Sequence, residues 1–217
     1  TYYKKEELLE ATGNVWIRDE GYPATLGAQK VTYDRKLRIG IATGNPVLRM
    51  IAESDDEDLI VTADSMEVYV DEHRAVALEN VRITRGKTHG RCHQAVFLDD
   101  EDKSILTGEP YLIQGRNSLS GETITIRSED NEISSVVVAG DAKCIYQSEK
   151  GEKSELNGNE IILSFQDGEL ALMDVTGDAI GNFRPGGVKR EKETNQVRGR
   201  SIRITFASGE ARTATVT

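Results

Sequence analysis

Apolar and polar residues alternate along most of this chain, in short segments separated by turn-forming residues. Alternation with a period of two predicts β-strands that have one buried and one solvated face. The segments fall into two sets of six windows, and each set aligns without a gap. The first set comprises Ala11–Ile17, Ala42–Leu48, Ala77–Ile83, Leu106–Leu112, Val138–Cys144 and Val175–Gly181, and the second Leu26–Tyr33, Val61–Val68, Gly90–Phe97, Leu119–Ile126, Leu156–Leu163 and Val197–Ile204. A repeat of roughly 30–40 residues built from two strand modules predicts a stacked β architecture.

The alternation changes phase once in each window of the second set, at a small residue. In the second window this residue is Ala63, and the apolar positions around it are Val61, Met66 and Val68. The odd step of three residues predicts a bulge or bend, where a small side chain relieves crowding. We therefore expect half of each repeat to be a kinked strand.

The windows of the first set carry a turn or bend signal, such as Gly13-Asn14 or Gly177-Asp178, after which the alternation resumes. Glycine adopts a positive φ without strain, and Asn or Asp stabilises such a bend through its side chain. The segments between windows are polar, and we interpret Glu53–Asp58 and Asp99–Lys103 as hairpin tips. The longest such segment, Arg184–Arg200, is basic and has no assigned role.

The predicted fold class is all-β: a repetitive antiparallel β-jellyroll of two facing sheets, open-ended and solenoid-like. The hydrophobic content of 37% and aromatic content of 6% suit a thin two-layer structure. No linker interrupts the repeat, so we expect one continuous domain over residues 1–217. The repeat begins and ends out of phase and without a polar cap, which indicates a fragment of a longer array or open edges that pair with another chain.

The charge of the chain argues against one class of partner. A net charge of −10 at pH 7 disfavours nucleic acid, whose binding is driven by Lys and Arg. No apolar run reaches the ~18–20 residues of a membrane-spanning helix, and no signal peptide is visible in the sequence.

Few residues suggest chemistry. Cys92 and Cys144 occupy apolar slots of the repeat and are expected to be buried free thiols, with a disulfide as the alternative. His89 and His93 would lie about 13 Å apart on a strand, which disfavours a shared metal ion. Trp16 lies between two inward positions and is expected to point outward.

Catalytic or metal-binding motifs are equally sparse. The acidic runs Asp55–Asp58 and Asp99–Asp102 lack the glycine spacing of a calcium loop and are interpreted as solvated tips. No nucleophile-elbow, P-loop or dinucleotide motif occurs. We therefore expect no enzyme activity, no catalytic residue, no metal and no cofactor.

The repeat resembles the OstA-like family of lipopolysaccharide-transport proteins. The matching segments are Leu26–Asp34 (LGAQKVTYD), Ala63–Tyr69 (ADSMEVY) and the Gly-Asn-Val at residues 13–15. The family implies a periplasmic β-jellyroll with an apolar groove between two sheets, which shields the acyl chains of lipid A. It also implies localisation in the periplasm, with association at the outer membrane. The implied partners are lipopolysaccharide or a related glycolipid, other β-jellyroll transport components joined end to end by strand pairing, and further copies of the chain.

The inward rows of the repeat supply the residues that would line such a groove. The predicted lining residues are Val31, Tyr33, Leu48, Met66, Val68, Ile83, Phe97, Leu112, Ile126, Ile161 and Leu163. The alternative role for each of these residues is to pack the two sheets together without contacting lipid. At the level of function, the alternatives are a structural β-solenoid with a packed interior that polymerises end to end, and a carbohydrate-active β-helix enzyme with carboxylates clustered on one face.

Overall fold

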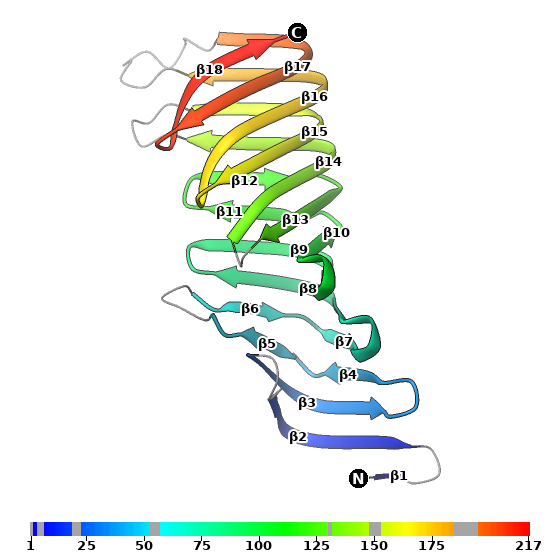
Figure 1. Ribbon diagram of the computed structural model, residues 1–217. Coiled ribbons are helices and arrows are strands. Elements are labelled where there is room, and N and C mark those ends of the chain that lie inside the picture. The colour runs from blue at the N-terminus through cyan, green and yellow to red at the C-terminus, as the bar shows by residue number, and fades with distance from the viewer. Residues whose placement is uncertain are drawn as a thin grey trace. The chain divides into compact units, whose positions relative to one another are not determined.

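The computed structural model describes residues 2–3, 7–18, 23–52, 57–129, 132–147, 153–184 and 195–217, and these form an all-β, antiparallel structure (Figure 1). The chain divides into two compact units, Thr1–Gly108 and Glu109–Thr217, which we call unit 1 and unit 2. The described residues contain no α-helix. The predicted fold class is confirmed, while the single continuous domain over 1–217 stays a prediction.

Unit 1 is a stack of short and long strands joined by tight connections. Its strands are β1 (Tyr2–Tyr3), β2 (Leu8–Arg18), β3 (Ala24–Asp34), β4 (Ile39–Thr43), β5 (Val47–Met50), β6 (Leu59–Thr62), β7 (Ser65–Tyr69), β8 (Arg74–Arg85), β9 (Thr88–Leu98) and β10 (Lys103–Thr107). Two 3₁₀ turns, η1 (Val70–Glu72) and η2 (Asp99–Glu101), connect β7 to β8 and β9 to β10.

Unit 2 continues the same pattern with longer strands. They are β11 (Tyr111–Gln114), β12 (Asn117–Ser120), β13 (Thr123–Glu129), β14 (Glu132–Gln147), β15 (Lys153–Gln166), β16 (Glu169–Arg184), β17 (Asn195–Ala207) and β18 (Glu210–Val216). The basic segment Arg184–Arg200 lies largely outside the described residues, since 185–194 are not among them.

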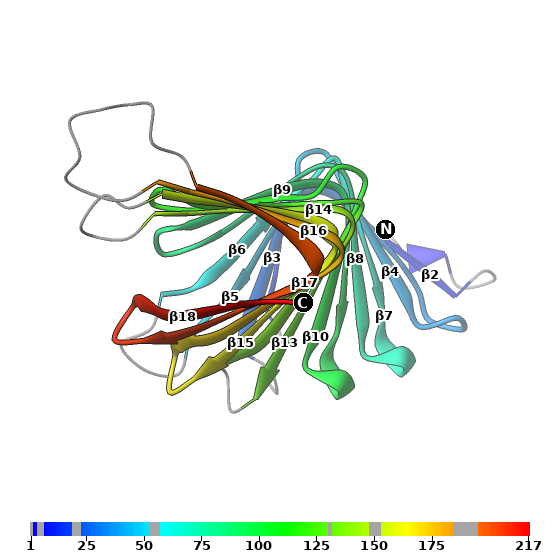
Figure 2. The same cartoon turned by 90° about the horizontal axis from the view of Figure 1, so that it is seen from above.

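Each long strand bends near its middle, so that each unit has two limbs that face each other (Figure 2). The register shifts at this point: Thr12 pairs with Lys30 and Val15 with Ala28, so that Gly13 and Asn14 oppose a single residue. The same irregularity recurs in the β8–β9, β14–β15, β15–β16 and β16–β17 pairs. The expected kink is therefore a β-bulge inside paired strands, and the Gly-Asn and Gly-Asp steps bend the chain without reversing it.

The limbs are defined by these bends. In unit 1 the first limb comprises 15–18, 24–28, 47–50, 59–62, 81–85 and 88–92, and the second comprises 8–12, 30–34, 39–43, 65–69, 74–78, 94–98 and 103–107. In unit 2 the first limb comprises 111–114, 117–120, 142–147, 153–158, 179–184 and 195–199, and the second 123–129, 132–139, 160–166, 169–176, 201–207 and 210–216.

Glycine is required at the bends for two separate reasons. Gly140 has a φ of +73°, and a Cβ placed on it would come within 2.5 Å of the Glu122 carboxylate. Gly177 has a φ of +74° and stands in the same relation to Asn159, at 2.6 Å. Glu122 and Asn159 each follow the small residue of a second-set window, and each lies over the bend glycine of the neighbouring strand. The small residue of one set and the glycine of the other therefore meet at the same bend.

Apolar rows run across the strands on the inward face, as the repeat predicts. In unit 1 the register aligns six buried residues of the second limb: Val31, Ala42, Met66, Ala77, Ala95 and Leu106. In unit 2 the equivalent row is Ile124, Val138, Ile161, Val175 and Ile202, each with 0% of its surface exposed. Removal of these apolar side chains from water stabilises each unit.

Both thiols are buried and free, as expected. Cys92 lies in unit 1, opposite Val81, and Cys144 lies in unit 2, opposite Leu156. Burial disfavours the thiolate, raising the pKa of Cys92 to about 11 and that of Cys144 to about 12. These groups are inert packing residues at neutral pH.

The tips of the second limb differ between the two units. In unit 1 the 3₁₀ turns carry charge: His73 Nδ1 lies 2.7 Å from the Asp100 carboxylate, which joins η1 to η2. In unit 2 the two tips that the structure describes are two-residue turns, Asp167-Gly168 and Ser208-Gly209, with positive φ at both residues. Such turns match the right-handed twist of the two strands that they join, and they need no side-chain contact between neighbouring tips.

Candidate functional site

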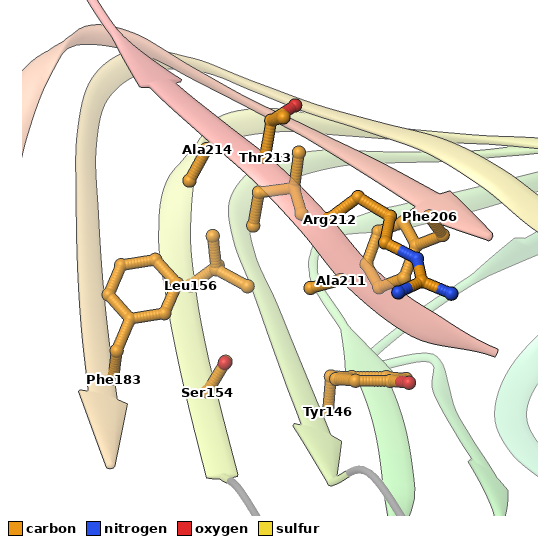
Figure 3. Close-up of a pocket in the computed structure, with 10 residues that line it drawn as sticks. Tyr146, Ser154, Leu156, Phe183, Phe206, Ala211, Arg212, Thr213 and Ala214 are labelled. Atoms are coloured by element: carbon orange, nitrogen blue, oxygen red, sulfur yellow. The ribbon is translucent and has the colours of Figure 1, made fainter. Parts of the chain in front are cut away.

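A groove opens between the two limbs of unit 2. Its volume is about 310 Å³. Ten residues line it: Tyr146, Ser154, Leu156, Phe183, Ile204, Phe206, Ala211, Arg212, Thr213 and Ala214 (Figure 3). Six of these ten are apolar, so the groove is suited to an apolar group.

The first limb provides one wall of the groove. Tyr146, Ser154 and Phe183 stand opposite one another on β14, β15 and β16, one step beyond the buried row that contains Leu156. They lie on the inward face because alternation places every second side chain there. Tyr146, Ser154 and Phe183 are half-buried, whereas Leu156 is fully buried and forms the base of this wall.

The second limb provides the opposite wall and ends at a strand of small side chains. Ile204 is buried on β17, and Phe206 is 9% exposed. Beyond them lies β18, whose groove-lining residues include Ala211, Thr213 and Ala214. The side chains of Ala211 and Ala214 are short and leave open the space that a Leu, Ile or Phe would fill, while the Thr213 hydroxyl lies 2.6 Å from that of Thr205 on the outward face.

Two aromatic rings connect the limbs at one end of the groove. Tyr146 and Phe206 meet edge to face, with ring centroids 5.3 Å apart. The Tyr146 hydroxyl also donates to the Gly209 carbonyl at the β17–β18 tip. This contact fixes the separation of the limbs at the point where the groove begins.

Gly181 makes room for the ring at the other end. A Cβ on Gly181 would lie 2.7 Å from the Phe183 ring and 3.2 Å from the Ile202 side chain. The buried glycine therefore lets the Phe183 ring fold toward the base of the groove.

The polar groups of the groove lie toward its exposed side. Arg212 and Thr213 are exposed on β18, and Figure 3 shows the Arg212 side chain on the same side as Phe206. An apolar base with a cation near the opening can accept a molecule that has an apolar chain and a polar or anionic end.

The interior of unit 1 is nearly filled. A void of about 10 Å³ lies between its limbs and is lined by apolar side chains that include Leu48, Met66, Val68 and Phe97. This is close to the smallest space that can hold one water molecule. This void is too small for an acyl chain.

All eleven predicted lining residues lie on inward rows, but none of them lines the groove of unit 2. Val31, Met66, Leu112, Ile161 and Leu163 are buried. Tyr33, Leu48, Val68, Ile83, Phe97 and Ile126 are half-buried, and four of the eleven enclose the small void of unit 1. Their contact with lipid stays a prediction.

Sequence reasoning missed the aromatic residues that shape the open groove. Tyr146 and Phe183 continue the apolar alternation two residues beyond the windows that end at Cys144 and Gly181, so the sequence already indicated their inward direction. Phe206 and β18 lie after the last window, where the repeat gives no register. Only the fold shows that these segments meet.

The remaining candidate residues lie apart from this groove. His89 and His93 are exposed on β9, and the His93 side chain lies against Gly108. Asp99–Glu101 forms an exposed tip, as expected, while 55–56 lie outside the described residues. No cluster of three His, Cys, Asp or Glu that could hold a metal is found in the part of the chain that the structure describes. The same residues contain no helix long and apolar enough to cross a membrane.

Comparison with known proteins gives similarity to solved structures and no match by sequence. No model of a protein family matches the chain, and no curated protein matches its sequence. The solved structures include a crystal structure of LptH from Pseudomonas aeruginosa, the LptA homologous periplasmic component of the lipopolysaccharide transport device. It shares 20% sequence identity at a TM-score of 0.45, over 64% of this chain and 93% of that one. At this level the similarity carries no argument about function, and the fold described above rests on its own strand pairing.

Proposed function

We propose that this chain is a non-enzymatic, periplasmic lipid-binding module that shields the acyl chains of lipopolysaccharide or a related glycolipid. The observation that carries the proposal is the apolar groove of about 310 Å³ between the limbs of unit 2. The OstA-like pattern of the repeat supports the lipid class and the location.

The energetics of acyl chains favour such a groove. Each methylene group kept from water contributes about 0.8 kcal/mol, so a chain of several methylenes is held by contact with Leu156, Phe183, Ile204 and Phe206. The volume is near the lower end of ligand pockets, which run from about 300 to 1,000 Å³. The groove of unit 2 thus suits one chain at a time, and a lipid with several chains needs further space.

Strand pairing is the proposed means of assembly with other jellyroll components and with further copies. Among the described strands β18 pairs with β17 alone, so its other edge offers backbone N–H and C=O groups. An edge of this kind would extend the stack and bring a second interior next to the groove.

Site-specific photocrosslinking tests the proposal. A photoreactive residue at Phe206 or Phe183 should crosslink to purified lipopolysaccharide, whereas one at Thr205, which faces outward, should not. Equal labelling at Phe206 and Thr205 would contradict the groove as the binding site. The same reagent at Tyr33, Val68 and Phe97, with Thr32 and Glu67 as outward controls, asks whether unit 1 opens to admit lipid.

The void of only about 10 Å³ in unit 1 favours a second candidate function. A β-solenoid with a packed interior would serve as a structural or assembly element that polymerises end to end. It predicts concentration-dependent filaments in solution, together with no crosslink to lipid at any inward position of either unit.

A further inference from the structure

The outward face of the first limb in unit 1 carries a charge opposite to that of the whole chain. The register aligns two outward rows across six strands: Trp16, Gly27, Val47, Thr62, Arg82 and Arg91, and beside them Arg18, Thr25, Arg49, Ile60, Thr84 and His89. These twelve positions contain four arginines and no Asp or Glu. We call them the basic face.

This distribution differs from that of the second limb of the same unit. There, the outward positions mix both signs: Glu10, Asp34 and Glu67 lie among Lys30, Arg74 and Lys103. Acidic residues lie at tips of both limbs, Asp71–Glu72 and Asp99–Asp102 in the second limb and Glu57–Asp58 in the first, so the two limbs differ in their faces and not in their tips. With a net charge of −10 for the chain, the basic face is a local reversal of sign.

The arginines of the basic face lie close together. Arg82 and Arg91 stand directly opposite each other on β8 and β9, which concentrates positive charge there. Arg49 is neutralised by Asp58 at the edge of the face, at 2.5 Å, but Arg18 and Arg82 are exposed. A surface that gathers positive charge in this way attracts anions.

Exposed apolar side chains lie among the same arginines. Trp16 is 73% exposed, and Val47 and Ile60 are each 36% exposed. The Trp16 ring lies over Gly27. A Cβ at that glycine would come within 3.2 Å of the ring. The ring is thus held on the surface as a platform, with its other face open to the surroundings.

We propose that the basic face binds the headgroup surface of an anionic phospholipid bilayer. Arginine forms paired hydrogen bonds with phosphate, and tryptophan favours the boundary between headgroups and acyl chains. The arginines and exposed apolar side chains are spread over six strands, which fits a lipid surface better than a single small anion. Repulsion from the acidic remainder of the chain is weakened at physiological salt, because charges are screened beyond about 8 Å.

This surface is independent of the groove in unit 2 and can be tested separately. Trp16 is the only tryptophan in the chain, so its emission reports on the basic face alone. Vesicles of phosphatidylcholine mixed with phosphatidylglycerol should shift the emission to the blue and carry the protein upward in a flotation gradient. Vesicles of phosphatidylcholine alone should do neither.

Matched variants assign the effect to the face. The double variant R18Q/R82Q should weaken vesicle binding about thirtyfold, since each basic residue near an anionic surface contributes about fivefold. The control R38Q/R203Q removes the same charge from arginines that lie elsewhere, paired with Asp71 and Asp174, and should bind like the unmodified chain. Circular dichroism of each variant confirms folding.

Three results would overturn the proposal. They are an absence of flotation with anionic vesicles, equal weakening by the two double variants, and an emission shift that depends on protein concentration without vesicles. The last result would assign the face to contact between copies of the chain. None of the three bears on lipopolysaccharide crosslinking at Phe206, so failure here leaves the groove proposal standing.

Discussion

The two units share a repeat, but the concavities found between their limbs differ about thirtyfold in volume. The void in unit 1 is about 10 Å³, whereas the groove of unit 2 is about 310 Å³. The difference arises from a few positions. Met66, Val68 and Phe97 line the small void of unit 1, while Ala211 and Ala214 line the groove of unit 2 and leave it open. One fold therefore yields a small void or an open groove according to side-chain size.

Truncation of large side chains should show the largest effect in this comparison. Met66→Ala removes a side chain that is 3% exposed and next to a closed void, so we expect unit 1 to lose about 2–5 kcal/mol of unfolding free energy. Ile204→Ala removes a buried side chain that borders the open groove, where water can enter the new space. Its cost should fall near the lower end of that range.

Chemical denaturation of both variants measures these costs. A cost for Ile204→Ala well above that for Met66→Ala would show that the groove wall is packed as tightly as unit 1.

A large side chain placed in the groove of unit 2 should reduce its volume toward that of the void in unit 1. Ala214→Trp places a large ring between the limbs and should lower the affinity for an acyl-chain probe at least tenfold. Thr215→Trp is the matched control, because Thr215 is the neighbouring exposed residue and pairs with outward-facing Arg203. Competition against a fluorescent fatty-acid probe measures both variants. Equal affinity in the two would place the probe outside the groove.

The two thiols report on each unit separately. Both have a raised pKa, of about 11 for Cys92 and about 12 for Cys144, because burial disfavours the thiolate. We expect neither to react with a thiol reagent at pH 8 in the folded protein, and both to react in denaturant. Rapid labelling of one alone would show that its unit opens locally.

The same pKa shifts predict a loss of stability at alkaline pH. The unfolded thiol loses its proton near pH 9, while the folded thiols keep theirs until about pH 11 and about pH 12. The contribution is complete below pH 9 and decreases as the pH rises above it. Cys92→Ala and Cys144→Ala should each flatten this decrease, as measured by thermal unfolding between pH 8 and 10.5.

The smallest effect is expected at the charged tips of unit 1. The Asp100 carboxylate raises the pKa of His73 above 6.5, chiefly through their hydrogen bond. The pair contributes fully below the unfolded pKa of His73, and the contribution is lost as the pH rises through the folded value. Asp100→Asn should lower the pKa of His73 in an NMR titration, whereas Asp174→Asn in unit 2 should leave it unchanged. An unshifted His73 in the Asp100 variant would refute the contact.

The sequence alone determined the repetition, the strand class and the inward rows of this protein. Alternation with a period of two places Val31, Met66 and Ile161 on one face, because side chains of a strand point to opposite sides in turn. The phase change at Ala63 and its equivalents indicated a bend, and the Gly-Asn or Gly-Asp steps indicated a positive φ. These are local properties, and residues within a few positions of one another fix them.

Only the tertiary structure decided where the interior is open. Tyr146, Phe183 and Phe206 are far apart in the sequence, and the volume between them depends on how the limbs converge and on the short side chains of β18. The same holds for the basic face, since Trp16, Arg49 and Arg82 become neighbours only through the register of five strand pairs. Periodicity gives the direction of a side chain, but the space beside it is set by residues that the chain brings back from elsewhere.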